Sequence, residues 1–290
     1  MEFAVDTALP SLSPAELHAL LGRADTPLLL DVRRPAVFEA SEWLLPGARH
    51  CAPEAVAAFA RSEPPRPVVV YCAYGHHLSE DATRTLCAAG WDARMLRGGI
   101  EGGETGVDPL QDIAHWRETP LPRIRKRPDL GVAGGRPSRW VTRARPKIDR
   151  IACPWLVLRF IDPRAQFFYV PEGEVMEQAR RLDAVAFDLP GAPITHEWER
   201  CSFDALLQAF ALRLPALDAL ATIVRGADTS RLSLAGPCAG LLALSLGLSR
   251  LHADDHAMLQ AALPLYDALY AWCRDGQGET HTWKAHEAAA

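Results

Sequence analysis

Apolar residues in the first third of the chain occur in short runs that alternate with amphipathic stretches. Three of these runs, 28–32, 67–71 and 93–96, predict short buried strands. Helices are expected over 13–21 and 79–89, because each segment opens with a serine followed by acidic residues. The alternation of strands and helices is typical of βα units. It therefore predicts an α/β fold with a parallel sheet and helices on both faces.

The second half of the chain has longer amphipathic stretches and fewer short apolar runs. Predicted helices cover 202–212, 215–224, 237–248 and 254–272, and predicted strands cover 139–142, 165–170 and 184–189. A mainly helical α+β domain is expected here.

A segment rich in proline and glycine separates the two patterns. At 290 residues the chain is about twice the usual length of one domain. We therefore predict a first domain at 1–118, a basic linker at 119–138, a second domain at 139–276 and a flexible tail at 277–290.

Composition narrows the class of protein. The chain is 49% hydrophobic and has seven scattered cysteines without a Cys-x-x-Cys pair, which argues against overall disorder, a disulfide framework and a cysteine-only zinc site. There is neither a run of about 18 apolar residues nor a signal-peptide pattern. A cytoplasmic location without membrane contact is the expectation.

Charge is unevenly distributed. Residues 123–150 contain ten Lys or Arg and two Asp, a net of +8 in a chain whose formal net charge is -5. A solvated connector is the ordinary interpretation of such a run, and contact with an anion or nucleic acid is the alternative. The acidic balance of the rest of the chain disfavours nucleic acid as the partner.

The clearest chemical signal follows the second predicted strand. Cys72 ends that strand, and a loop then leads into the next helix; its residues are Ala73, Tyr74, Gly75, His76, His77 and Leu78. Ligands collect at the carboxyl ends of parallel strands, and unpaired N–H groups at the start of a helix stabilise anions. A thiolate or a persulfide would be stabilised there, so Cys72 is a candidate nucleophile. The alternative is a small apolar residue that fills the end of a strand.

Four motifs follow one another in this half; they are Asp31-Val32-Arg33, Pro46-Gly47-Ala48, the loop from Cys72 to His77, and Leu96-Arg97-Gly98-Gly99-Ile100-Glu101-Gly102. In their order and spacing they resemble rhodanese domains. The resemblance implies a sulfurtransferase in which Cys72 accepts a sulfane sulfur and passes it to a thiol or cyanide, without a cofactor. Active thiosulfate sulfurtransferases often carry arginine where this chain has Ala73 and His77, which makes thiosulfate a poor donor.

Asp31 and Arg33 are expected to support the loop structurally, because charges beside a buried strand need partners.

Polar residues of the second half gather in short clusters between apolar runs. Asp149, Arg150, His196 and Asp228 belong to three such clusters. Histidine and aspartate are ligands of divalent metals, and a neighbouring arginine suits an anion. We expect His196, Asp149 and Asp228 to share one pocket with Arg150 nearby, as a site for a divalent metal or an oxyanion, with ordinary caps and surface ion pairs as the alternative.

Further motifs are spread over residues 138–275; they are Trp140-Val141-Thr142-Arg143, Asp149 to Leu156, Arg159 to Asp162, Thr195-His196-Glu197 with Cys201-Ser202-Phe203, and Tyr266 to Trp272. With these motifs the segment resembles the C-terminal domain of the chromate-resistance ChrB proteins. The resemblance implies a role in chromate resistance or its regulation. Chromate and thiosulfate are similar dianions that arginine binds alike, and chromate oxidises thiols, so an oxyanion such as chromate is a candidate partner.

The sequence thus favours a sulfurtransferase that acts through Cys72, with a sulfane-sulfur donor and a thiol acceptor as partners. The alternative is a sensor or regulator in which the first domain binds an oxyanion or a redox signal without turnover. In that case the basic segment contacts a partner or nucleic acid.

Overall fold

The computed structural model describes residues 9–279. Its first part is a five-stranded sheet of order β1-β6-β5-β2-β4 in which all neighbours are parallel. The strands are β1 (Ser11–Leu12), β2 (Leu28–Asp31), β4 (Arg49–His50), β5 (Val68–Tyr71) and β6 (Ala93–Leu96). The helices are α1 (Pro14–Leu20), α2 (Pro35–Ala40), α3 (Val56–Ser62), α4 (His77–Ala88) and α5 (Leu110–Glu118), with a 3-10 turn η1 (Pro53–Ala55).

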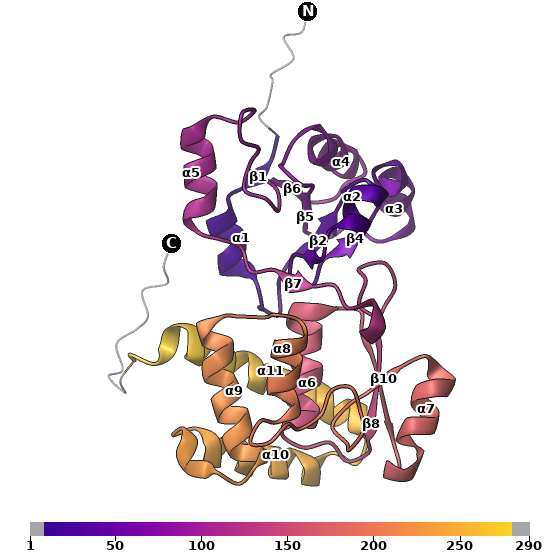
Figure 1. The fold of residues 1–290 in the computed structure, drawn as a ribbon, viewed down its shortest axis with the longest axis vertical. Helices are drawn as coiled ribbons and strands as arrows, with labels where there is room; N and C mark the ends of the chain where they lie inside the picture. Colours follow the sequence, from indigo (N-terminus) through magenta and orange to yellow (C-terminus); the bar gives the residue numbers. More distant parts are fainter. Residues whose placement is uncertain (1–8, 280–290) are drawn as a thin grey trace, which may run out of the picture.

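Alternation along the central strands explains why helices cover both faces of this sheet. Leu30, Val68 and Val70 pack with residues of α3 and α4, whereas Leu29 and Val69 pack with residues of α1 on the opposite face. The predicted α/β fold with helices on both faces is confirmed. Figure 1 shows the sheet and these helices in the upper part of the molecule.

The second part combines a small sheet with most of the remaining helices. Its sheet has the order β10-β8-β9, with parallel neighbours. The strands are β8 (Arg139–Arg143), β9 (Gln166–Val170) and β10 (Val185–Ala186). The helices are α6 (Asp149–Leu156), the π-turn η3 (Val157–Ile161), α7 (Val175–Leu182), α8 (Ser202–Ala209), α9 (Pro215–Asp228), α10 (Cys238–Leu251), α11 (Asp255–Ala271) and the π-turn η6 (Trp272–Gly276), with 3-10 turns η4 (Glu172–Glu174) and η5 (Leu232–Leu234). The predicted mainly helical α+β architecture is confirmed.

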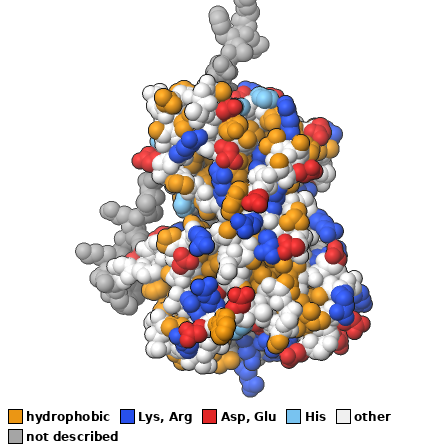
Figure 2. All heavy atoms as spheres, viewed as in Figure 1, with side chains coloured by type: hydrophobic (Ala, Val, Ile, Leu, Met, Phe, Trp, Pro, Cys, Tyr) orange, Lys and Arg blue, Asp and Glu red, His pale blue; other side chains and the backbone are white. Residues whose placement is uncertain are grey.

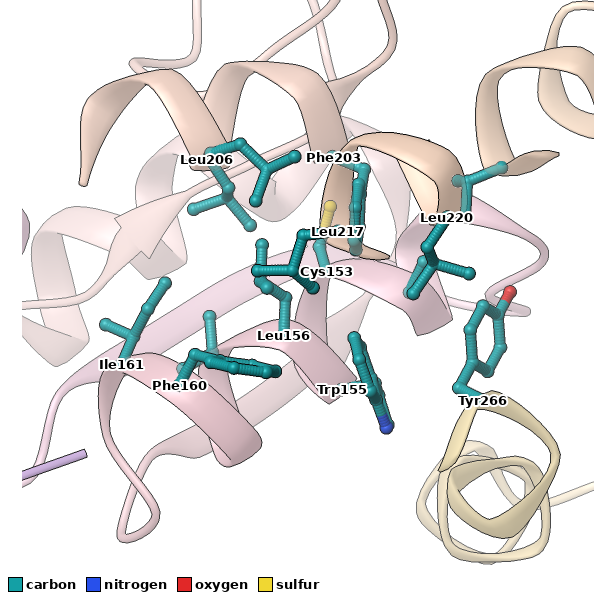
Figure 3. Packing of buried hydrophobic residues seen from close by; sticks show 14 of the residues in the cluster. Cys153, Trp155, Leu156, Phe160, Ile161, Phe203, Leu206, Leu217, Leu220 and Tyr266 are labelled. Carbon is teal, nitrogen blue, oxygen red and sulfur yellow. The ribbon is translucent and has the colours of Figure 1, made fainter. Parts of the chain in front are cut away.

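The core of this second part forms where α6 crosses α8, α9 and α11. Figure 3 shows Trp155, Leu156, Phe160 and Ile161 of α6 and η3 facing Phe203 and Leu206 of α8, Leu217 and Leu220 of α9, and Tyr266 of α11. Because α6 is buried along nearly its whole length, the residues at its start are held rigidly in the interior.

The basic segment between the two parts is packed against them. Its strand β7 (Ile124–Arg125) pairs antiparallel with β3 (Trp43–Leu44), and the turn η2 (Pro128–Leu130) follows. Ile124 and Leu130 are buried in the same core as α6, and so are Phe38 and Leu44 of the first part. Figure 1 shows β7 between the two parts. The proposed division at 118 and 138 stays a prediction, and most of the predicted tail lies outside the described residues.

Three local predictions are corrected. Helix α4 begins at His77 rather than Ser79, and the cap of α8 is Cys201 rather than Ser202, because Asp204 accepts the backbone N–H of Cys201. The strand predicted at 184–189 is confined to β10, because Asp188 adopts a positive φ of 58° that ends the extended backbone. Among the described residues, every helix is too short or too polar to cross a membrane.

Candidate functional site

Cys72 lies at the carboxyl end of β5, on the face that α4 covers. Its residue is only 5% exposed, and it belongs to the core between the sheet and α4. Its Sγ is 3.3 Å from Oγ of Ser79, and that hydroxyl group lies 2.9 Å from the carbonyl oxygen of His76. The sulfur therefore sits at the floor of the loop that enters α4.

Backbone packing holds the loop in place. Gly75 has a φ of +80°, and a Cβ there would lie 2.8 Å from N of Gly98. The N–H of Ile100 donates to the carbonyl of Cys72 at 3.0 Å, and the N–H of Glu101 donates to that of Ala73 at 2.9 Å. Two glycine-containing segments thus pack backbone to backbone, which fixes the position of Cys72.

Unpaired amides line the route from Cys72 into α4. Among residues 9–279, none of the backbone N–H groups of Ala73, Tyr74, Gly75 and His76 has a hydrogen-bond acceptor. They precede a twelve-residue helix, in which the N–H groups of His77 and Leu78 also have no acceptor among these residues, whereas those of Ser79 and Glu80 donate to the carbonyl of His76. Such a turn stabilises negative charge.

A pocket of about 210 Å³ opens over this loop. Its lining residues include Cys72, Arg33, Arg34, Tyr74, His76, His77, Leu78 and Glu104. His76 Nε2 lies 3.1 Å from an oxygen of Asp108, so this histidine is held at the rim. Arg34 and His77 are exposed, and neither has an ion-pair partner among the described residues. Arg34 therefore supplies a cation where the loop itself lacks an arginine.

Asp31 and Arg33 form a buried ion pair beneath the pocket. Arg33 is 2% exposed, and its Nη2 lies 2.6 Å from an oxygen of Asp31, while its Nε is 3.0 Å from both carboxylate oxygens. Arg33 also donates to the carbonyl of Trp43 at 2.9 Å. This geometry ties the end of β2 to the segment before β4.

A second cluster of polar side chains lies in the other half of the molecule. Nε2 of His196 is 3.1 Å from Asp149, 3.2 Å from Asp188 and 3.2 Å from Asp228. Asp149 begins α6 and Asp228 ends α9, while His196 and Asp188 lie on the connection that follows β10. The structure thus brings together three of the four predicted residues.

Arg150 reaches this cluster through Asp188. Its Nε is 3.2 Å from Asp188 Oδ2, and Arg143 Nη2 is 3.0 Å from the same oxygen. Oγ of Ser202 donates to Asp188 Oδ1 at 3.0 Å. Asp188 is therefore a hub that joins His196 to two arginines.

Burial and mutual contact shift the protonation of these groups. Burial raises the pKa of Asp149, and the neighbouring carboxylates of Asp188 and Asp228 raise it further, against the hydrogen bond with His196. The carboxylates of Asp149, Asp188 and Asp228 raise the pKa of His196 well above its usual range, although its own burial works against this. Burial alone would raise the pKa of Asp188, but hydrogen bonds from His196, Ser202 and Arg143 lower it.

Sequence reasoning missed two residues that complete these sites. Ser79 contacts the sulfur of Cys72 but reads as an ordinary helix-start serine. Asp188 stands alone in the apolar stretch 185–189. A single carboxylate in such a stretch needs buried partners, and this signal marks Asp188 as a candidate without identifying the partners.

Comparison with known proteins identifies both halves. Residues 13–105 match the model of the rhodanese-like domain, and residues 140–273 match that of the ChrB C-terminal domain. The chain joins a rhodanese-like domain to a ChrB C-terminal domain. The rhodanese-like domain carries Cys72, and the ChrB C-terminal domain carries the cluster around His196.

A curated relative agrees with this assignment. The chain is 34% identical over 152 residues to Protein ChrB of Cupriavidus metallidurans, an alignment that covers 48% of this chain and 45% of that protein. The chain thus spans less than half the length of this curated relative.

Solved structures are similar to part of this chain. A rhodanese homolog of Thermus thermophilus is 34% identical, with 31% of this chain and 96% of that chain covered and a TM-score of 0.26. An As/Sb reductase of Leishmania major is 17% identical, with 41% and 87% covered and a TM-score of 0.30.

Proposed function

We propose that the rhodanese-like domain is a sulfurtransferase whose nucleophile is Cys72. The observation that carries the proposal is the position of its sulfur at the floor of a pocket, beneath a loop whose amides lack acceptors. These groups suit a thiolate and, after sulfur transfer, a persulfide of the same charge. No cofactor is needed for this chemistry.

The reaction consists of two displacements at sulfur. The Cys72 thiolate attacks the sulfane sulfur of a donor such as thiosulfate, the sulfur–sulfur bond of the donor breaks, and sulfite leaves with the bonding electrons. The product is a persulfide on Cys72. A thiolate or cyanide then attacks the outer sulfur, which regenerates the Cys72 thiolate and releases a persulfide or thiocyanate.

The pocket offers two groups to the donor. Arg34 and His77 line it and have no ion-pair partner among the described residues, whereas Arg33 is occupied by Asp31. A guanidinium group binds an oxyanion through charge-assisted hydrogen bonds. Arg34 thus provides the guanidinium group that the loop between Cys72 and α4 lacks.

The ChrB C-terminal domain supports a link between this activity and chromate resistance. A sensor that binds an oxyanion such as chromate without turnover remains the second candidate. The burial of Cys72 favours neither the sulfurtransferase nor the sensor, because persulfide formation and redox sensing both use the sulfur of Cys72.

Mass spectrometry of the intact protein tests the proposal. After incubation with thiosulfate or an organic persulfide, the wild-type chain should gain one sulfur atom, and Cys72→Ser should gain none. A persulfide found on another cysteine, or none with any donor, would falsify the sulfurtransferase and leave the sensor.

Cys87→Ser is the matched control. Cys87 lies on α4 and is the exposed cysteine of the described residues, whereas Cys72 is buried. If exposure alone decided reactivity, Cys87 would carry the added sulfur. Retention of the adduct in Cys87→Ser therefore shows that the loop, rather than access, selects the sulfur.

A further inference from the structure

We propose that Asp149, His196 and Asp228 of the ChrB C-terminal domain bind one divalent transition-metal ion. Each residue offers a ligand atom, and the three atoms lie within 4.8 Å of one another. Ligand atoms that each lie about 2 Å from one ion are only slightly closer to one another than these three atoms are, so small side-chain movements would complete such a site. This site is independent of Cys72.

Hydrogen bonding alone does not satisfy the geometry. Three carboxylate oxygens lie 3.1–3.2 Å from a single nitrogen, Nε2 of His196. That nitrogen carries at most one hydrogen and can donate one good hydrogen bond. The remaining oxygens face it without a proton between them, whereas a cation at their centre would attract all of them.

The charges of the cluster also favour a bound cation. Arg143 and Arg150 are both engaged by Asp188. Within residues 9–279, Asp149 and Asp228 have no cationic partner apart from His196. Asp149 is 1% exposed, and its Oδ1 has no hydrogen-bond donor among these residues. A divalent ion held also by a neutral imidazole would balance the charges of the buried carboxylate of Asp149 and the partly buried carboxylate of Asp228.

The donor set selects the class of ion. One imidazole nitrogen with carboxylate oxygens suits Mn²⁺, Fe²⁺ or Zn²⁺ better than Mg²⁺ or Ca²⁺, which prefer oxygen alone. Cys153 and Cys201 lie in the same core, but burial raises the pKa of both thiols and keeps them protonated. Cu⁺, a soft ion that binds preferentially to thiolate or thioether sulfur, is therefore disfavoured.

Access for the ion is provided on the side of His196. Its side chain is 39% exposed, and that of Asp228 is 15% exposed, whereas that of Asp149 is 2% exposed. The ion would thus be anchored by one buried carboxylate and approached from the solvent across the other two ligands. Positions facing the solvent would remain open to water.

Metal titration of the full chain tests the proposal. The protein is stripped with EDTA, dialysed, and titrated with Zn²⁺ by calorimetry and with Mn²⁺ by electron paramagnetic resonance. One ion per chain is expected in the wild type. His196→Ala and Asp228→Asn should each weaken binding about tenfold or more, since even partners outside the coordination sphere change affinity by 10- to 100-fold.

The two variants avoid the buried core, and circular dichroism checks that both remain folded. Asp218→Asn, an exposed acid on the same helix as Asp228, and His115→Ala, an exposed histidine of α5, should bind as the wild type does. Cys72→Ser should also bind normally, which separates this outcome from that of the sulfur-transfer experiment. The proposal would be overturned if the wild type bound no ion, if His196→Ala and Asp228→Asn both kept the affinity of the wild type, or if the wild type preferred Mg²⁺.

Discussion

The two sites are held by different kinds of contact. Backbone contacts position Cys72, because Gly75 packs against Gly98 and Gly99 and the carbonyl of Cys72 accepts a hydrogen bond from the N–H of Ile100. Around His196 the holding is done by charged side chains that meet from three separate segments. The first site depends on the shape of a loop, and the second on the balance of buried charge.

This difference predicts which substitutions each site tolerates. The site around Cys72, which is held by backbone packing, should be sensitive to an added methyl group and insensitive to a change of charge nearby. The site around His196, which is held by charged side chains, should be sensitive to a change of charge and less sensitive to an added methyl group. The reason is that an unpaired buried charge costs more free energy than a small change in volume. Both sensitivities are measurable in the same chain.

Removal of the charge at Asp188 should have the largest effect on stability. Asp188→Asn keeps the shape and tolerates the left-handed backbone at φ 58°, so the charge is the main change. It leaves Arg143 and Arg150 without their shared carboxylate. We expect a loss of about 3 kcal/mol in the free energy of unfolding, measured in urea with EDTA present.

Asp183→Asn is the control for this comparison. Asp183 also has a positive φ, and it pairs with Arg136 on the surface, where both side chains are more than 70% exposed. Its loss should cost less than about 1 kcal/mol. If the two variants were equally stable, the charged hub would not be what holds the second site.

An added methyl group at Gly99 should have the next largest effect. Gly99 has a φ of +58°, and a Cβ there would lie 2.5 Å from the carbonyl oxygen of Ala73 and 2.6 Å from that of Cys72. Because both neighbours are backbone atoms, Gly99→Ala must displace the loop. We expect a loss of about 2 kcal/mol in the free energy of unfolding and slower persulfide formation.

Gly90→Ala separates the steric effect from the backbone effect. Gly90 has a φ of +86°, but a Cβ there would meet nothing within 4 Å. It should lose only about 1 kcal/mol, and its rate of persulfide formation should match that of the wild type. Normal sulfur transfer by Gly99→Ala would contradict the view that backbone packing positions Cys72.

The same difference explains what was predictable from the sequence. The Cys72 loop is one continuous segment between a strand and a helix, so its residues and its place in the fold could be predicted together. The central strands were predictable for the same reason, because their alternation is local. Asp149, His196 and Asp228 could be named as polar residues among apolar runs, but their spacing does not force them to meet.

Some features required the tertiary structure. The strands β1, β4 and β7 have two residues each, which is too short for periodicity to detect. Asp188 became a hub only because Arg143 at the end of β8 and Arg150 on α6 converge on it. Ser79 gained its contact with Cys72 from the start of α4 at His77, two residues earlier than predicted.

The smallest expected effect concerns the basic segment 123–150. Figure 2 shows Lys and Arg side chains interspersed with Asp and Glu on one face of the molecule. Of the ten basic side chains in this segment, eight have an ion pair or a hydrogen bond within residues 9–279; they are Arg123, Lys126, Arg127, Arg136, Arg139, Arg143, Arg145 and Arg150. Arg125 lies over the ring of Trp43, and Lys147 is exposed without such a partner. As around His196, most of these charges are already used inside the molecule.

Binding to duplex DNA should therefore be weak and carried by Arg125 and Lys147. Each phosphate contact contributes about 0.9 to the slope of log affinity against log salt, so two contacts give a slope of about -2. Fluorescence anisotropy with labelled duplexes at several salt concentrations measures this slope. The double variant Arg125→Ala with Lys147→Ala should abolish the residual binding, whereas Arg127→Ala, whose guanidinium pairs with Asp129, should leave it unchanged. A slope steeper than about -5 with preference for one sequence would show that the paired arginines release their partners for DNA, and it would favour the regulator over the sulfurtransferase.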